Sequence, residues 1–194
     1  MTGFYLYQDL DGCLADFKKG VSDWIYKLLT GELEIKNSKS APRKIRKYIA
    51  KHGRSYKLLT EEDLNLREVK DLMYLVASQP GFFASLERID NDLWETIMSA
   101  TCFDNIRFLT APIGVHAEKD KKTWCRETLQ SSYECIVVDR KDKMQFANTH
   151  NVLIDDNEKT CKEWREAGGI AFQWPLEQAQ LYRFLSLHSQ SKVS

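Results

Sequence analysis

The feature that most constrains this chain is a pair of carboxylates at the end of its first apolar run. Residues 4–7 (Phe-Tyr-Leu-Tyr) predict a short buried strand, and Asp9 and Asp11 follow it almost at once. Gly12 then allows a sharp turn of the backbone. A strand that ends in this way places both acids at the carboxyl edge of a sheet, where open α/β sheets bind their ligands.

Two carboxylates so close together need a compensating charge. At short range they repel by roughly 4 kcal/mol at an effective dielectric constant of about 20. A hard cation such as Mg²⁺, which prefers oxygen ligands, would offset this repulsion. One acid could then act as a nucleophile and the other as a proton donor. A turn capped by acids would have a purely structural role, and an isolated Asp-x-Asp does not decide between the two.

The second half of the chain alternates between strand and helix patterns. Short apolar runs predict strands at residues 106–109, 136–138, 152–154 and 170–172. Helical patterns lie between and after these runs, at residues 119–129, 160–167 and 176–187. This alternation predicts an α/β fold, a Rossmann-like core in which helices flank both faces of a parallel sheet.

A largely helical stretch separates the first strand from the others. Helical spacing is present at residues 21–30, 64–77 and 91–100, and Thr60 is the expected N-cap of the second of these helices. We therefore expect a core domain formed by residues 1–17 and 101–194. Residues 18–100 are expected to form a helical cap, inserted directly after the Asp-x-Asp turn.

Polar residues also follow the other predicted strands. Thr110, with the backbone N–H of Ala111, could donate to a phosphate, and Lys143 could neutralise one. Asp155 and Asp156 end another apolar run and are candidate metal ligands. Each residue has a simpler role when taken alone: a structural threonine, a solvated lysine, or a helix-capping turn. Lys121 and Lys122 are further candidates with equally weak individual signals.

Together these stretches resemble the motifs of the haloacid dehalogenase (HAD) superfamily of phosphatases. The string Asp-x-Asp-Gly-x-x-x-Asp-Phe matches its first motif, and Asp-x-Asp, Thr, Lys and Asp-Asp follow one another in the superfamily's order. The resemblance implies a HAD-like core domain in which Asp9 attacks phosphorus and forms an aspartyl-phosphate. It also implies that Asp11 protonates the leaving group and then activates water.

Longer strings are similar to the 5'(3')-deoxyribonucleotidase family within that superfamily. They are Asp-Leu-Asp-Gly-Cys-Leu-Ala-Asp-Phe, Pro-Gly-Phe-Phe-Ala-Ser-Leu at residues 80–86, and Leu-Thr-Ala-Pro-Ile at residues 109–113. The match runs from about residue 4 to residue 158 and is weak through residues 30–78. It implies Mg²⁺-dependent hydrolysis of nucleoside monophosphates. Ala111 departs from the family, which usually has a second hydroxyl there.

The same resemblance implies a role for each candidate residue. The Asp9 side chain, the Asp11 backbone carbonyl and the Asp155 side chain would hold Mg²⁺, with Asp156 in support. Thr110, Ala111 and Lys143 would hold the phosphate, with help from Lys121. Aromatic residues of the cap would recognise the base, although each of them could equally well pack in the cap core; the candidates are Phe17, Trp24, Phe82 and Phe83.

A basic segment leaves the chemical class of the substrate undecided. Residues 36–57 carry nine Lys or Arg residues and no acid. The segment is either a solvated face or a surface that attracts phosphate, including a polynucleotide. One rival to the nucleotidase is therefore a phosphatase of the same superfamily that acts on phosphorylated DNA or RNA ends. A second rival is a phosphatase of small sugar phosphates, and a third is a non-catalytic nucleotide-binding module.

Composition and charge limit the classes of protein to which this chain can belong. The formal net charge is 0, so overall charge does not make the chain a polyanion binder. The five cysteines form no Cys-x-x-Cys pair, their number is odd, and no secretory leader precedes the first strand. We therefore expect reduced thiols and a cytoplasmic location. No apolar run approaches the ~20 residues of a membrane span. The family resemblance also implies a homodimer.

Overall fold

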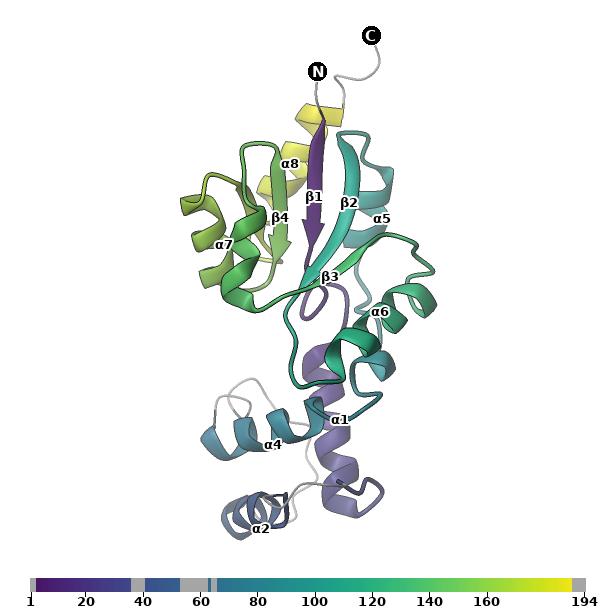
Figure 1. Cartoon of the computed structure of the whole chain (residues 1–194), viewed down its shortest axis with the longest axis vertical. Coiled ribbons are helices and arrows are strands. Elements are labelled where there is room, and N and C mark those ends of the chain that lie inside the picture. Colours follow the sequence, from purple (N-terminus) through teal and green to yellow (C-terminus); the bar gives the residue numbers. More distant parts are fainter. Residues whose placement is uncertain (1–2, 36–40, 53–62, 64–65, 190–194) are drawn as a thin grey trace. The chain divides into compact units, whose positions relative to one another are not determined.

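The computed structural model describes residues 3–35, 41–52, 63 and 66–189 (Figure 1). Five strands form one sheet in the order β3-β2-β1-β4-β5, and every pair of neighbours is parallel. The strands are β1 (Phe4–Gln8), β2 (Phe103–Thr110), β3 (Cys135–Val137), β4 (Asn151–Asp155) and β5 (Ile170–Gln173). This sheet confirms the predicted α/β fold with a parallel sheet.

The register of the sheet brings the ends of the first strand and two later strands together. β1 lies in the centre, with Gln8 opposite Phe108 of β2 on one side and Ile154 of β4 on the other. All five residues of β4 are buried, as expected for a parallel strand that is covered on both faces. The residues that directly follow or end these strands therefore meet at one edge.

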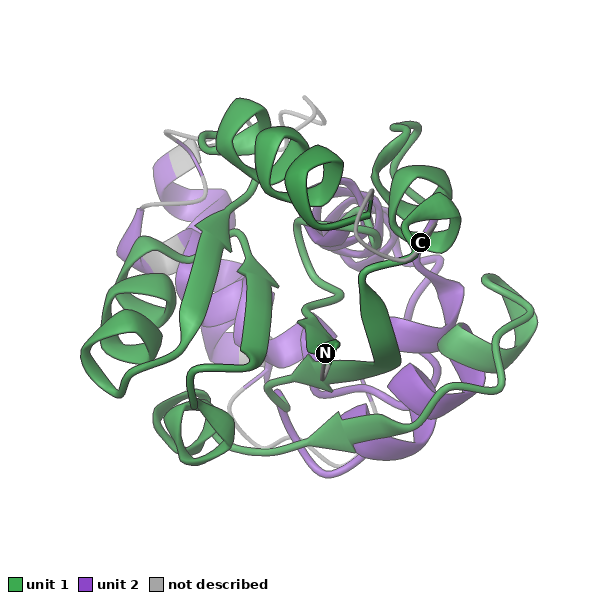
Figure 2. Cartoon of the chain, turned by 90° about the horizontal axis from the view of Figure 1, so that it is seen from above, with its two compact units in different colours: residues 1–16, 88–112, 125–194 green, residues 17–87, 113–124 purple. Residues whose placement is uncertain are grey.

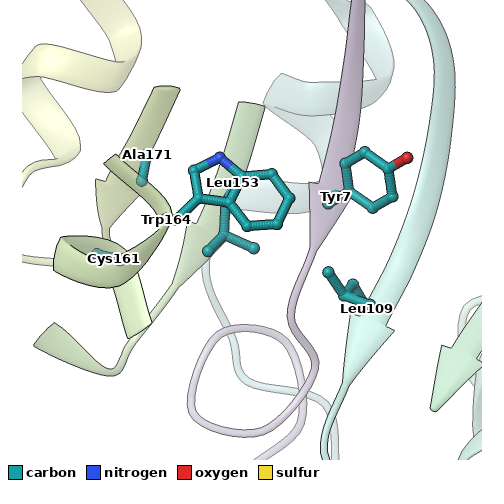
Figure 3. Packing of buried hydrophobic residues seen from close by; sticks show 6 residues of the cluster. All are labelled: Tyr7, Leu109, Leu153, Cys161, Trp164 and Ala171. Atoms are coloured by element: carbon teal, nitrogen blue, oxygen red, sulfur yellow. The ribbon is translucent and has the colours of Figure 1, made fainter. Parts of the chain in front are cut away.

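Helices cover the two faces of the sheet. On one face, α7 (Glu158–Glu166) and the 3₁₀ helix η2 (Arg140–Phe146) pack on side chains of β1, β2 and β4. Trp164 lies across this face, with Leu153 and Tyr7 beside its indole (Figure 3). On the other face, α5 (Leu93–Ser99) places Trp94 against Phe108. α8 (Gln178–Ser189) packs there too, through contacts of Phe184.

The chain divides into two compact units (Figure 2). Unit 1 contains the whole sheet and comprises residues 1–16, 88–112 and 125–194. Unit 2 is helical in its described part and comprises residues 17–87 and 113–124. Its helices are α1 (Phe17–Thr30), α2 (Ala41–His52), α4 (Arg67–Ala77), the 3₁₀ turn η1 (Phe83–Ser85) and the part of α6 (Ala117–Glu127) that precedes residue 125.

One element differs in kind from the prediction, and others differ at their ends. The sequence around Asp142 and Lys143 is typical of a charged loop, but the structure forms η2 there, and Phe146 at its end packs on Tyr7 with ring centroids 5.6 Å apart. The helix predicted at 119–129 begins at Ala117 and ends at Glu127. The predicted N-cap Thr60 lies outside the described residues.

Two expectations about the whole chain concern its cysteines and its helices. All five cysteines lie in the described part of the chain, and none forms a disulfide bond. No helix within the described ranges combines the length and the apolar character needed to cross a lipid bilayer.

Candidate active site

Three neighbouring strands of unit 1 place polar candidate residues at one edge of the sheet. Asp9 follows β1, and its N–H donates to the carbonyl oxygen of Ile154 at 2.9 Å. Thr110 ends β2 and Asp155 ends β4, and both are buried. Because β1 lies between β2 and β4, the parallel register brings the ends of these strands side by side. This edge is the expected ligand edge of an open α/β sheet.

Lys143 joins two of these acids. Its Nζ lies 2.8 Å from Oδ1 of Asp9 and 2.7 Å from Oδ2 of Asp155. The residue exposures are 3% for Lys143, 5% for Asp9 and 1% for Asp155, so water screens these contacts poorly. The distances are those of charge-assisted hydrogen bonds. The ammonium therefore neutralises part of the negative charge that the strand ends create.

The protonation of Lys143 and Asp155 depends on their shared environment. Burial alone would lower the pKa of Lys143, but the Asp9 and Asp155 carboxylates outweigh it and raise that pKa above its ordinary value. Burial also raises the pKa of Asp155, to about 6, and the charge of Asp9 adds to this effect. The Lys143 ammonium and the N–H of Asn157 oppose it. The cluster therefore holds a fixed cation and a carboxyl group with raised proton affinity.

Asp156 and the turn after β1 complete the acidic cluster. Asp9, Asp155 and Asp156 each offer an oxygen within 4.8 Å of the others. Asp156 is an exposed residue, yet partial burial of its carboxylate raises its pKa to about 7, with help from the charges of Asp9, Asp155 and Asp11. Asp11 itself is half-buried in the turn. The charges of Asp9, Asp11 and Asp155 therefore all act on the Asp156 carboxylate.

Gly12 is required where the turn approaches Asp156. Its φ is +75°, a backbone conformation that side chains disfavour. A Cβ at this position would lie 2.1 Å from Oδ2 of Asp156. The glycine therefore permits both the turn and the close approach of a candidate metal ligand.

The segment Asp155–Asn157 serves the site and a helix at the same time. Oδ1 of Asp155 accepts a hydrogen bond from the N–H of Asn157 at 2.9 Å. Oδ1 of Asn157 in turn accepts from the N–H of Thr160 at 3.0 Å and caps α7. The two interpretations of this string, a metal ligand and a helix-capping turn, are thus compatible because different residues satisfy them.

Gln8 is a site neighbour that sequence reasoning missed. Its side chain is completely buried, and Nε2 donates to the carbonyl oxygen of Asp9 at 2.7 Å. Oε1 has no hydrogen-bond partner among the described residues. A polar residue in an otherwise apolar strand was the available signal, since a buried amide needs a partner.

Ala111 directly follows Thr110 in unit 1 and is half-buried, whereas the remaining candidates lie in unit 2. Lys121 is buried, and its Nζ lies 4.4 Å from the ring centroid of Phe83 in a cation–π contact. Phe82 and Phe83 are also buried, whereas Phe17 and Trp24 are half-buried. The Phe82 ring contacts the other three aromatic candidates at centroid distances of 5.0–5.8 Å. The four aromatic candidates therefore form one cluster, in which Phe17 and Trp24 keep exposed surface.

A cavity of about 450 Å³ opens beside Trp24 within unit 2. Its lining combines an indole with polar side chains of three other segments and consists of Trp24, Leu33, Glu34, Ser78, Gln79, Pro80 and His116. The indole is fixed because its Nε1 donates to Oγ of Ser85 at 3.1 Å. The volume lies in the usual range for small-molecule sites. Sequence reasoning did not find His116 or Glu34, because they come from separate segments without a common motif.

Comparison with known proteins supports the fold. No family model matches the chain, and no curated protein matches it. Solved structures do match it, including the putative HAD-hydrolase YfnB from Bacillus subtilis bound to magnesium. That structure has 15% sequence identity, covers 95% of this chain and 99% of its own, and gives a TM-score of 0.50. A HAD-superfamily hydrolase from Ehrlichia chaffeensis has 9% identity, covers 96% and 98%, and also gives a TM-score of 0.50. The chain thus has the Rossmann-like fold of HAD hydrolases.

Proposed function

We propose that this chain is a Mg²⁺-dependent phosphatase that hydrolyses nucleoside 5'- or 3'-monophosphates, with a preference for deoxyribonucleotides. The observation that carries the proposal is the buried contact of Lys143 with both Asp9 and Asp155, at the ends of adjacent parallel strands. The fold supports a HAD-type phosphatase. The nucleotide substrate rests on the resemblance of the motifs to the 5'(3')-deoxyribonucleotidase family.

The donor set fits a hard divalent cation. Asp9, Asp155 and Asp156 offer carboxylate oxygens within 4.8 Å of one another, which are ligands that Mg²⁺ accepts. The backbone carbonyl of Asp11 would add a further oxygen. When bound, Mg²⁺ would neutralise the phosphate and the charge that develops during transfer.

The proposed reaction has two displacements. An oxygen of Asp9 attacks phosphorus while the ester P–O bond breaks, and Asp11 gives its proton to the departing nucleoside oxygen. Asp11 then takes a proton from water, whose oxygen attacks phosphorus. The bond between phosphorus and Asp9 breaks, which releases inorganic phosphate and restores both acids. Lys143, Thr110 and the N–H of Ala111 hold the phosphate oxygens during both steps.

We propose that unit 2 supplies substrate specificity as the inserted cap. The cavity beside Trp24 has the size and the mixed lining that a nucleobase requires. An indole offers a stacking face, while Gln79 and Glu34 offer hydrogen-bonding groups for the edge of a base. Trp24 is therefore the aromatic candidate that we assign to base binding, and Lys121 stays a proposed phosphate contact.

The test of the proposal is phosphate release with Mg²⁺ across a substrate panel. The panel contains all 5'- and 3'-deoxyribonucleoside and ribonucleoside monophosphates, sugar phosphates, and oligonucleotides phosphorylated at either end. Selective turnover of a few monophosphates supports the nucleotidase. Asp9→Asn keeps the shape of the side chain but removes the nucleophile, so it should abolish turnover and leave the fold intact. Substantial activity of this variant would contradict the role of Asp9.

A second variant tests the metal site separately. Asp155→Asn replaces a charged ligand with a neutral one and should raise the Mg²⁺ concentration needed for half-maximal activity. An unchanged Mg²⁺ titration would reject Asp155 as a ligand. Nucleotide binding without any phosphate release would instead support the non-catalytic module.

A phosphatase of polynucleotide ends is the second candidate. The described part of the basic segment, α2, carries five Lys or Arg residues and no acid, which favours a polyanionic substrate. Residues 36–40 and 53–57 of that segment lie outside the described residues. Phosphate release confined to oligonucleotide ends would support this candidate over the nucleotidase.

A further inference from the structure

The basic residues of α2 are arranged as a stripe. Arg43, Arg46, Lys47 and Lys51 are all exposed and are spaced three, four and eight residues from the first. Residues with this spacing lie on one face of an α-helix. In the sequence, Ile45, Tyr48 and Ile49 already have helical spacing within the run of charge, and the helix places four of the basic residues on one outward face. We call these four residues the α2 stripe.

The opposite face of α2 is already occupied. Ala41 and Tyr48 are 3% and 5% exposed, and α2 contacts α4 within unit 2 (Figure 1). Lys44 lies at the side of the helix, where its Nζ is 3.7 Å from a carboxylate oxygen of Asp71 on α4. An amphipathic helix binds a membrane by burying its apolar face in the lipid. The apolar face of α2 is used for packing, which argues against a lipid surface as the partner.

We propose that the α2 stripe binds the phosphate backbone of a polynucleotide. Arg43 and Lys51 lie about 12 Å apart along the helix axis, because an α-helix rises about 1.5 Å per residue. This length contains about three intervals between successive phosphates of one DNA strand, which are about 3.4 Å apart along a duplex, so it spans about four phosphates. The stripe has one cation for each of them, so charge and length are both complementary. This inference concerns binding alone and does not rest on the proposed hydrolysis.

Counter-ion release gives the inference a quantitative signature. Each phosphate neutralised on a single strand contributes about −0.7 to the slope of log K against log salt concentration. Four cations therefore predict a slope of about −3 for single-stranded DNA, and a steeper one for a duplex. Removing two of them should bring the slope to about −1.5 and weaken binding at 0.1 M salt by about tenfold or more.

The experiment measures binding of the full chain to fluorescein-labelled oligothymidylate, oligouridylate and duplex DNA by anisotropy, in EDTA so that no turnover occurs. Arg43→Gln with Lys47→Gln removes two adjacent charges of the α2 stripe. The matched control is Lys159→Gln with Lys162→Gln, which removes two exposed lysines of α7. A charge-preserving pair, Arg43→Lys with Lys47→Arg, separates loss of charge from any change in the helix. Circular dichroism checks the fold of each variant.

We expect the double variant Arg43→Gln with Lys47→Gln to bind the oligonucleotides more weakly and to lose about half of the salt slope. The α7 double variant and the charge-preserving double variant should bind like the wild-type protein. The inference is overturned if the unchanged chain binds none of the three probes, or if the α2 and α7 pairs weaken binding equally. Binding to vesicles of anionic lipid in place of the polynucleotides would also overturn it. Failure of the proposed hydrolysis would leave these binding results unaffected.

Discussion

At the scale of single residues, the candidate site depends on the balance of charge around Lys143. One ammonium faces two carboxylates, and all three side chains are almost completely buried. Such a cluster is stable only while every charge has its partner, because an unpaired buried charge is costly. The stability of the metal-free protein and the position of the proposed nucleophile Asp9 therefore depend on the same lysine.

The first prediction removes this lysine. Lys143→Met should destabilise the metal-free protein by about 3–5 kcal/mol, because it leaves Asp9 and Asp155 uncompensated. The measurement is urea unfolding in EDTA at pH 8. Lys141→Met is the matched control, since Lys141 is exposed and should change stability by no more than about 0.5 kcal/mol. Equal losses in the two variants would contradict the role assigned to Lys143.

The second prediction concerns Gly12. Gly12→Ala should cost about 1–2 kcal/mol because of its positive φ, and its Cβ should also displace the Asp156 carboxylate. Gly168→Ala is a matched control, since Gly168 has a φ of +89° but no atom within 4 Å of the added Cβ. Both variants should lose similar stability in urea unfolding, but only Gly12→Ala should bind Mg²⁺ more weakly by calorimetry. Unchanged Mg²⁺ affinity of Gly12→Ala would show that Asp156 does not take part.

At the scale of elements, the turn between β4 and α7 connects the sheet to the site. Asp155 ends the strand and faces Lys143, while Asn157 begins the helix two residues later. Trp164 of the same helix packs on Tyr7 and Leu153, which fixes α7 against the sheet. The helix therefore holds the end of β4 in place through packing as well as through its cap.

The third prediction separates the cap from the site. Asn157→Ala should lower the free energy of unfolding by about 1 kcal/mol, because the N–H of Thr160 loses its acceptor. The backbone N–H that Asn157 donates to Asp155 remains, so Mg²⁺ affinity should stay unchanged. Asn157→Ser provides another capping oxygen and should recover most of the stability. Urea unfolding and Mg²⁺ titration of both variants check this, and a loss of Mg²⁺ affinity in the alanine variant alone would contradict it.

At the scale of the whole molecule, the acidic cluster links folding to pH. The pKa of Asp155 is raised in the folded protein to about 6, from an ordinary value near 3.8. A carboxyl group with a raised pKa holds its proton more tightly when folded, so its contribution to stability falls as pH rises through this interval. A cation that binds the ionised carboxylates has the opposite dependence, because protons compete with it.

The fourth prediction follows from this opposition. In EDTA, the unchanged chain should lose stability relative to Asp155→Asn as pH rises from about 4 to about 6, because the variant has no carboxyl to ionise there. In saturating Mg²⁺, the rise in melting temperature caused by the metal should increase over the same interval. Thermal unfolding of both proteins at each pH measures the two effects. A metal-induced shift that is independent of pH would contradict ligation by these carboxylates.

What the sequence determined by itself is the order of the elements and the identity of the acids at their ends. Apolar runs and helical spacing reflect each segment's own neighbours, so the parallel α/β fold and the positions of Asp9 and Asp155 at strand ends followed without coordinates. Only the tertiary structure decided which groups meet. Lys143 is 134 residues from Asp9 in the chain, and it reaches that carboxylate through a 3₁₀ helix that no periodicity predicted. Only the tertiary structure also shows that Gly12 lies beside Asp156 and that the basic residues of α2 share one exposed face. Contact and exposure are set by packing between segments.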